Sequence, residues 1–156
     1  MSERVEFFST RLVRENAPDL PQNRVRGPGG IAQVARTLLP DDTDRETFMV
    51  IMLDSQNGIR GASIVTVGTL TAALCHPREV FKAAILASAA SIVLVHNHPS
   101  GDPEPSPEDI ETTAALIAAG MVLGIPVRDH VILGEHGQYC SLMERGLVTL
   151  PTTHGS

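Results

Sequence analysis

Four stretches of the chain carry the hydrophobic pattern of β-strands. Residues 47–53 and 91–95 are short, continuous runs rich in apolar and β-branched side chains, which is typical of strands buried on both faces. Residues 127–133 alternate between apolar and polar positions and are predicted as a further strand. Asn57-Gly58 is the strongest short signal for a hairpin, so we expect residues 59–67 to return antiparallel to residues 47–53.

Apolar residues at helical spacing alternate with these strands. They predict a short helix at 31–38 that ends before Pro40, and a helix at 77–90 with Pro77 at its first position. A longer helix is predicted from Pro107 to Gly124, and its apolar face consists of Ile110, Thr113, Ala114, Ile117 and Met121. Strands and helices that alternate along a chain indicate the α/β class.

The two ends of the chain carry weaker patterns. Residues 4–14 alternate loosely and are predicted as an edge strand, and a loop rich in Pro, Gly, Asn and Asp follows at 16–30. The last residues, 151–156, are predicted to be a frayed tail. We therefore divide the chain into an N-terminal strand, loop and short helix at 1–45, a main domain at 46–150, and this tail.

Composition and charge narrow the class of protein. The chain has 156 residues, enough for one domain with a hydrophobic core, and a net charge of −6. Nucleic-acid binding generally needs a basic face, so nucleic acid is not an expected partner. The first residues lack the apolar core of a signal peptide, and the apolar stretch at 83–95 is too short to span a bilayer. We therefore expect a cytoplasmic protein with no membrane partner, in which Cys75 and Cys140 are free and buried.

Candidate chemistry gathers where the strand at 91–95 ends. Side chains two residues apart in an extended chain point the same way, about 7 Å apart, so His96 and His98 can converge on one ion. The proline-rich segment that follows must leave the sheet, and the next helix, capped by Ser106, carries Asp109 in its first turn, where the helix dipole favours a carboxylate. Two imidazoles and one carboxylate, with a fourth position open to water, are a catalytic zinc arrangement. This pattern indicates a metal site.

Each part of the pattern also has a structural interpretation. Ser106-x-x-Asp109 is a capping-box pattern with Asp in place of Glu, so Asp109 can be a helix cap alone. His96 and His98 can be two hydrogen-bonded core residues. The buried strand, the His-x-His pair, the loop and the Ser-x-x-Asp helix start nevertheless fit one site together, which favours the metal interpretation.

The same residues resemble a known family. His96-x-His98, seven further residues and then Ser106-x-x-Asp109 match the signature of the JAMM (JAB1/MPN) metalloproteases. The loop sequence is similar to the bacterial RadC-like branch, and the resemblance covers roughly residues 46–148. It implies a three-layer JAB/MPN fold, related to that of the cytidine deaminases, in which helices flank a mixed β-sheet.

The resemblance also implies how the residues share the chemistry. His96, His98 and Asp109 would hold Zn²⁺, which lowers the pKa of a bound water to roughly 7. Ser106 would donate a hydrogen bond to the oxyanion of a tetrahedral intermediate, and its oxygen can still accept one as a helix cap. The ligand set by itself does not separate zinc from another divalent metal.

The general base is expected at Glu46, because the catalytic glutamate of JAMM proteins stands at the start of such a strand. From local sequence alone, a solvated carboxylate at a strand end is the simpler interpretation of Glu46. Glu104 and Glu108 compete for the role because they lie close to the histidines in sequence. His130, in the strand at 127–133, is expected to be structural or to support a ligand.

The implied function is zinc-dependent hydrolysis of a peptide or isopeptide bond in a polypeptide substrate, such as a ubiquitin-like conjugate. The alternative is a catalytically silent MPN-type interaction module, and a DNA-repair-associated factor is a lesser one. Nucleobase deaminase chemistry is excluded, because the chain has neither H-x-E nor P-C-x-x-C. The substrate's identity and the oligomeric state, a homo-oligomer included, stay open.

Overall fold

Five strands form one mixed sheet in the order β2-β1-β3-β4-β5. The computed structural model describes residues 2–15, 18–39, 44–68 and 75–151. Its elements, in chain order, are α1 Gly27–Leu38, β1 Thr47–Leu53, β2 Ile59–Val67, α2 Pro77–Leu86, β3 Ser91–Asn97, α3 Pro107–Leu123, β4 Val127–Leu133 and β5 Tyr139–Ser141. Only β3 and β4 pair in parallel, and the other neighbouring strands of this sheet pair antiparallel.

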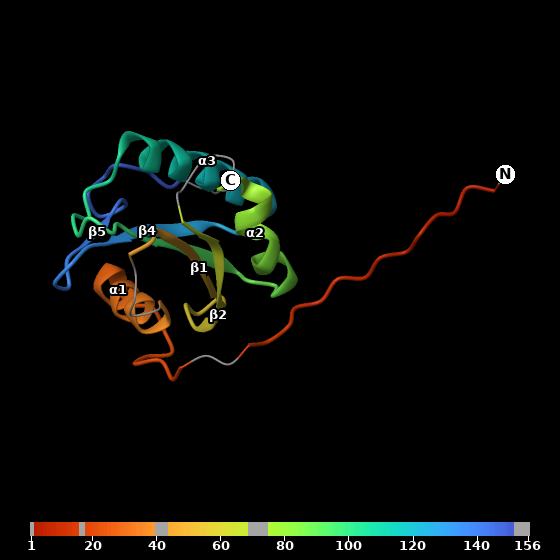
Figure 1. Cartoon of the computed structure of the whole chain (residues 1–156), viewed down its shortest axis with the longest axis horizontal. Helices are drawn as coiled ribbons and strands as arrows, with labels where there is room; N and C mark the ends of the chain where they lie inside the picture. The colour runs from red at the N-terminus through yellow and green to blue at the C-terminus, as the bar shows by residue number, and fades with distance from the viewer. Residues whose placement is uncertain (1, 16–17, 40–43, 69–74, 152–156) are drawn as a thin grey trace, which may run out of the picture.

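The sheet lies between two layers of helices (Figure 1). α1 covers one face, and α2 and α3 lie together on the other. Successive side chains of a strand point to opposite faces, so β1 contributes to both cores. Phe48 and Val50 pack in the core that α2 and α3 complete, whereas Met49 and Ile51 pack in the core that α1 completes. Burial on both faces explains the continuous apolar run, and the α/β class with a mixed sheet between helices is confirmed.

The signals for the hairpin and for the last helix are also confirmed. Asn57 adopts the left-handed backbone conformation, with φ of 60°, where β1 turns into the antiparallel β2. Ser106 is the N-cap of α3 and Pro107 is its first residue. Gly124 follows the helix with a φ of 70°, a conformation that glycine adopts without strain. Local chemistry therefore sets both ends of the helix that carries Asp109.

The predicted edge strand at 4–14 is wrong. Residues 2–15 form neither helix nor strand, and Val5, Phe7 and Phe8 are 84%, 99% and 86% exposed. A strand needs a neighbour to satisfy its backbone groups, and a loose alternation of side chains does not supply one. The alternation in this segment is therefore a poor guide to its structure.

Other boundaries differ less. The helix predicted at 31–38 begins already at Gly27, and the helix predicted at 77–90 ends at Leu86, because Ser88 has a φ of 53° that interrupts it. Pro40 and the tail after 151 lie outside the described residues, and the division at residue 45 stays a prediction. Both cysteines are free and buried, as expected. Within the described part of the chain, no helix is long and apolar enough to cross a membrane.

Candidate metal centre

The register between β1 and β3 brings Glu46 beside the two histidines. Phe48 of β1 pairs with His96 of β3 in an antiparallel register, so the same register carried two residues further sets Glu46 level with His98. Alternate residues of a strand share a face, and Phe48 belongs to the core under α2 and α3. Glu46 and His96 therefore lie on the side of the sheet from which α3 presents Asp109.

Three side chains meet at short distances in this place. Nε2 of His96 is 2.9 Å from Nε2 of His98. The carboxylate of Asp109 has Oδ2 at 3.2 Å from His98 Nε2 and Oδ1 at 3.5 Å from His96 Nε2. Ligands that are each about 2.0–2.1 Å from a tetrahedral zinc ion lie about 3.3 Å from one another. The three observed distances, two of which go to different oxygens of Asp109, bracket this value, so the three side chains lie close enough together to share one ion.

Glu46 belongs to the same cluster. One donor atom each of Glu46, His96 and His98 lie within 4.8 Å of one another, so the histidines are shared by two triads, one with Glu46 and one with Asp109. The oxygens of Asp109 approach the ring nitrogens to 3.2 and 3.5 Å. Two carboxylates therefore lie beside the same pair of histidines.

The two competitors of Glu46 lie elsewhere. Glu104 is exposed, and its two carboxylate oxygens accept hydrogen bonds of 2.7 and 3.2 Å from the guanidinium of Arg145. Glu108 is also exposed, on the first turn of α3. Of the three glutamates, only Glu46 lies in the cluster.

Asp109 is a helix cap and a histidine partner at once. Its Oδ2 accepts a hydrogen bond from the Ser106 amide (2.9 Å), and its own amide donates to Ser106 Oγ (3.1 Å), which completes the capping box. Burial opposes ionisation of Asp109, but its close contacts with the rings of His96 and His98 outweigh burial and hold its pKa well below the ordinary value. The same carboxylate raises the pKa of His98. The capping interpretation therefore does not exclude the metal interpretation.

Each histidine is held through its other ring nitrogen. Nδ1 of His98 lies 2.9 Å from the carbonyl oxygen of Asp102, and Nδ1 of His96 lies 2.7 Å from Nε2 of His130. Such partners orient metal-binding imidazoles. His130 is 1% exposed, and burial lowers its pKa well below the ordinary value, which favours the neutral ring. The structure thus places His130 against a candidate ligand, in the supporting position that was one of its two expected roles.

Sequence reasoning missed Asn97, which lies between the two histidines. Strand alternation turns its side chain away from theirs, and its amide bridges the backbone on both sides of Glu46. Asn97 Oδ1 accepts a 2.7 Å hydrogen bond from the Thr47 amide, and Nδ2 donates to the Arg45 carbonyl at 3.0 Å. The available signal was an amide side chain that directly continues an apolar strand. Such a residue is expected to be buried, as Asn97 is, and buried polar groups are nearly always hydrogen-bonded. Asn97 therefore links β3, which carries His96, to the backbone around Glu46, the residue expected to act as base.

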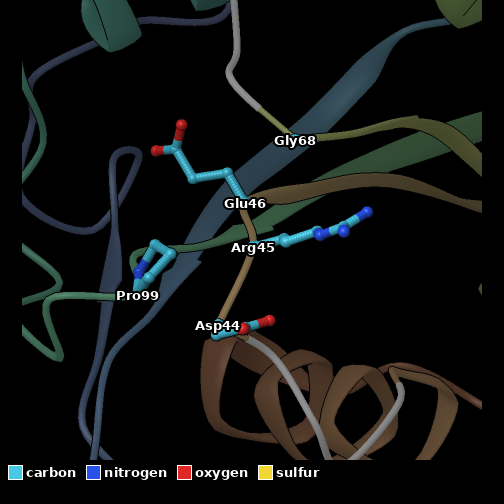
Figure 2. A pocket seen from close by; sticks show the side chains of 5 residues that line it. All are labelled: Asp44, Arg45, Glu46, Gly68 and Pro99. Carbon is cyan, nitrogen blue, oxygen red and sulfur yellow. The ribbon is translucent and has the colours of Figure 1, made fainter.

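An open pocket of about 470 Å³ adjoins the cluster and is lined by Asp44, Arg45, Glu46, Gly68 and Pro99. Figure 2 shows the side chains of Glu46 and Arg45 pointing to opposite sides of the β1 entry, with Pro99, the residue after His98, on the side of Glu46. The amide of Gly68 donates a 2.8 Å hydrogen bond to the Glu46 carbonyl, which joins the end of β2 to the same place. Glu46 is thus shared by the pocket and the histidine cluster.

Comparison with known proteins identifies the family of the chain. The family model described as "RadC-like JAB domain" matches residues 25–147, so the match includes α1, ahead of the range 46–148 expected from the resemblance. It confirms the expected JAB/MPN fold. The match also includes every residue of the cluster described above.

Curated relatives carry the printed name "UPF0758 protein". One from Syntrophomonas wolfei is 48% identical over 127 residues, which are 80% of this chain and 54% of that protein. One from Symbiobacterium thermophilum is 55% identical over 104 residues, which are 67% of this chain and 44% of that protein. This chain spans about half the length of the curated relatives it matches. The family match and these identities together show that the chain belongs to the RadC-like JAB domain family.

Proposed function

We propose that this chain is a metal-dependent hydrolase of peptide or isopeptide bonds, with a polypeptide such as a ubiquitin-like conjugate as its substrate. The observation that carries the proposal is the spacing of 2.9–3.5 Å among the donor atoms of His96, His98 and Asp109. Glu46 beside them adds a carboxylate with the reach of a general base. Because the relatives are longer, the activity of a whole protein is part of this proposal.

The proposed metal is zinc, held by His96, His98 and Asp109. Two imidazoles and one carboxylate are a known zinc set, and one position stays open in catalytic sites of this kind. When bound, the ion supplies Lewis-acid chemistry, which acidifies water and polarises a carbonyl group. The protein's own contribution is to hold the donors: Asp109 by the helix cap and the histidines by Asp102 and His130.

Glu46 and Ser106 would move and place the protons. Glu46 lines the open pocket and lies near both histidines, where its carboxylate would take a proton from the attacking water and return it to the leaving amine. The Ser106 oxygen accepts from the Asp109 amide, so its own hydroxyl proton can donate to the substrate's carbonyl oxygen as negative charge develops there. One such donor is typically worth about 3 kcal/mol of transition-state stabilisation.

A catalytically silent interaction module is the alternative. Members of the fold that lose ligands act as scaffolds, whereas this chain retains both histidines, the aspartate, the serine and a glutamate in the cluster. The retained set favours catalysis. A role in DNA repair gains no support from the net charge of −6, because DNA binding relies on basic side chains.

Elemental analysis of the whole chain, purified without chelator, tests the metal site. We expect about one zinc per chain in the wild type and in His136→Ala, a control histidine that is 89% exposed, and loss of zinc in His98→Ala and Asp109→Ala. A wild type that carries no metal and takes up none from added zinc would refute the proposal. Retention of full zinc content by both ligand variants would do so too.

A second step separates metal binding from catalysis. Glu46→Gln removes the base and keeps the side chain's size, so we expect zinc to stay while cleavage of a fluorogenic lysine-isopeptide substrate falls by about 10²–10⁴-fold. If wild-type chains loaded with zinc cleave none of a panel of peptide and isopeptide substrates, the silent module replaces the hydrolase. If Glu46→Gln cleaves as fast as the wild type, the base is another group.

A further inference from the structure

A chain of hydrogen bonds runs from the backbone of α3 to the candidate ligand His96. Thr113 Oγ1 lies 2.6 Å from the carbonyl oxygen of Asp109 and 2.5 Å from Nδ1 of His130. Nε2 of His130 lies 2.7 Å from Nδ1 of His96. Thr113 and His130 are 0% and 1% exposed, so bulk water does not compete for these bonds. We call this series, from the Asp109 carbonyl through Thr113 and His130 to His96, the tautomer relay.

The relay has one direction in which every contact is a hydrogen bond. The Asp109 carbonyl can only accept, so the single hydrogen of the Thr113 hydroxyl must point to it. The hydroxyl oxygen can then only accept from Nδ1 of His130, which must carry a hydrogen. A neutral His130 with its hydrogen on Nδ1 presents a bare Nε2, and that nitrogen accepts from Nδ1 of His96.

The opposite direction leaves two acceptors in contact. A hydrogen on Nε2 of His130 would leave Nδ1 bare, and Thr113 would then have to turn its hydrogen toward the ring. Its oxygen would face the Asp109 carbonyl at 2.6 Å with no hydrogen between them. Buried acceptors without a donor are costly, so this arrangement is disfavoured.

We infer that Thr113 and His130 are positioning residues that fix His96 as the tautomer with its hydrogen on Nδ1 and a bare Nε2 directed at the metal centre. Free histidine prefers the other tautomer, so the environment has to impose this one. Nε2 is the atom of His96 that lies 2.9 Å from His98 and 3.5 Å from Asp109. The relay therefore prepares His96 to bind a metal, and this inference rests on the proposed function of the same centre.

The relay also couples the ligands. It starts at the backbone carbonyl of Asp109 and ends at His96, while the Asp109 side chain reaches the same histidine. A shift of the first turn of α3 would disturb a carboxylate ligand and an imidazole ligand together. His98 has a simpler arrangement, because its Nδ1 donates directly to the Asp102 carbonyl.

The tautomers can be observed in the metal-free wild type by long-range ¹H–¹⁵N NMR of the histidine rings. We expect Nδ1 of both His96 and His130 to be protonated, and Nε2 of His130 to be bare. A neutral His96 that carries its hydrogen on Nε2 would overturn the inference. No variant is needed for this result, so it does not depend on whether a substituted chain folds.

Zinc affinity, measured by competition with a chelating dye, tests the relay through substitutions at residues that are not themselves candidate metal ligands. Thr113→Val removes the hydroxyl at nearly constant size, and we expect it to weaken zinc binding about tenfold, the lower end of the range for outer partners of metal ligands. Thr112→Val, one residue earlier on α3 and outside the relay, should bind as the wild type does. His130→Phe should weaken binding at least as much as Thr113→Val, and His130→Gln should recover part of the loss, because its amide oxygen can accept from His96.

These outcomes are separate from the fate of the proposed function. Wild-type affinity in both Thr113→Val and His130→Phe would overturn the relay even if the enzyme cleaves isopeptides. The expected tautomers and affinities in a protein that cleaves nothing would support the relay and refute the hydrolase. Neither measurement requires a substrate.

Discussion

Asn97→Ala should reduce catalysis much more than metal binding. The substitution removes the amide that accepts from Thr47 (2.7 Å) and donates to Arg45 (3.0 Å), and so releases the backbone on both sides of Glu46. Thr47 is 4% exposed, so its amide loses a partner that water replaces poorly, which costs about 1–3 kcal/mol. The carbonyl of the exposed Arg45 can accept a hydrogen bond from water instead, so the loss of this second bond costs less stability. We expect a loss of about 2 kcal/mol in the free energy of unfolding, measured by urea denaturation.

Asn97→Ala should lower activity because it displaces Glu46, and not because it destabilises the fold. The histidines and Asp109 keep their own contacts, so zinc content should stay at the wild-type level. A displacement of Glu46 by about 1 Å can cost about 10²-fold in rate, so kcat on an isopeptide substrate should fall by one to two orders of magnitude.

Val93→Ala is the matched control for this variant. Val93 lies on the same strand as Asn97, faces α1 as Asn97 does, and is fully buried. It pairs with Ile51 of β1, five residues beyond Glu46. Removing its two methyl groups should cost about 2 kcal/mol of stability. It should leave kcat unchanged. If Asn97→Ala keeps wild-type kcat, or if Val93→Ala loses as much, Asn97 does not position the base.

Two further predictions concern stability and pH. Asp129 accepts hydrogen bonds of 2.7 Å from the His130 amide and from the Ser141 hydroxyl. Asp129→Ala should therefore lower the free energy of unfolding by about 3 kcal/mol, measured by urea denaturation, and the isosteric Asp129→Asn should lower it distinctly less. Equal losses in the two variants would contradict this. Asp109 raises the pKa of His98, and a protonated imidazole cannot bind a metal, so zinc affinity should fall as the pH drops through this raised pKa, at a higher pH than for an ordinary histidine. Zinc titrations over a pH series would contradict the reasoning if affinity held down to the ordinary histidine pKa.

Most of the regular structure could be predicted from local signals, because those signals act over a few residues. Asn57-Gly58 specifies a hairpin by itself, and Ser106, Pro107 and Gly124 specify the ends of α3 by capping and backbone conformation. The prediction of a strand at 4–14 was wrong for the same reason. Alternation shows that a segment could pair, but only a neighbouring strand decides that it does.

The candidate site divides in a similar way. His96, His98 and Asp109 are linked by strand alternation and by one short loop, so their convergence could be anticipated from spacing. Glu46 is fifty residues from His96 in sequence, and only the resemblance suggested it; in the structure, the β1–β3 register brings the two together.

The sequence by itself determined the α/β class, the elements that carry the candidate site and the types of its donor atoms, because periodicity, caps and donor types are properties of neighbouring residues. Only the tertiary structure decided which residues hold the side chains of that site in place through hydrogen bonds. Asn97 of β3 bonds to the backbone on both sides of Glu46, and His130 of β4 contacts His96 of the neighbouring β3. Thr113, predicted as one more position on a helix face, supplies the hydroxyl between His130 and the Asp109 carbonyl. Hydrogen bonds between distant segments depend on the order and register of the strands, which the packing of the whole sheet against α1, α2 and α3 establishes.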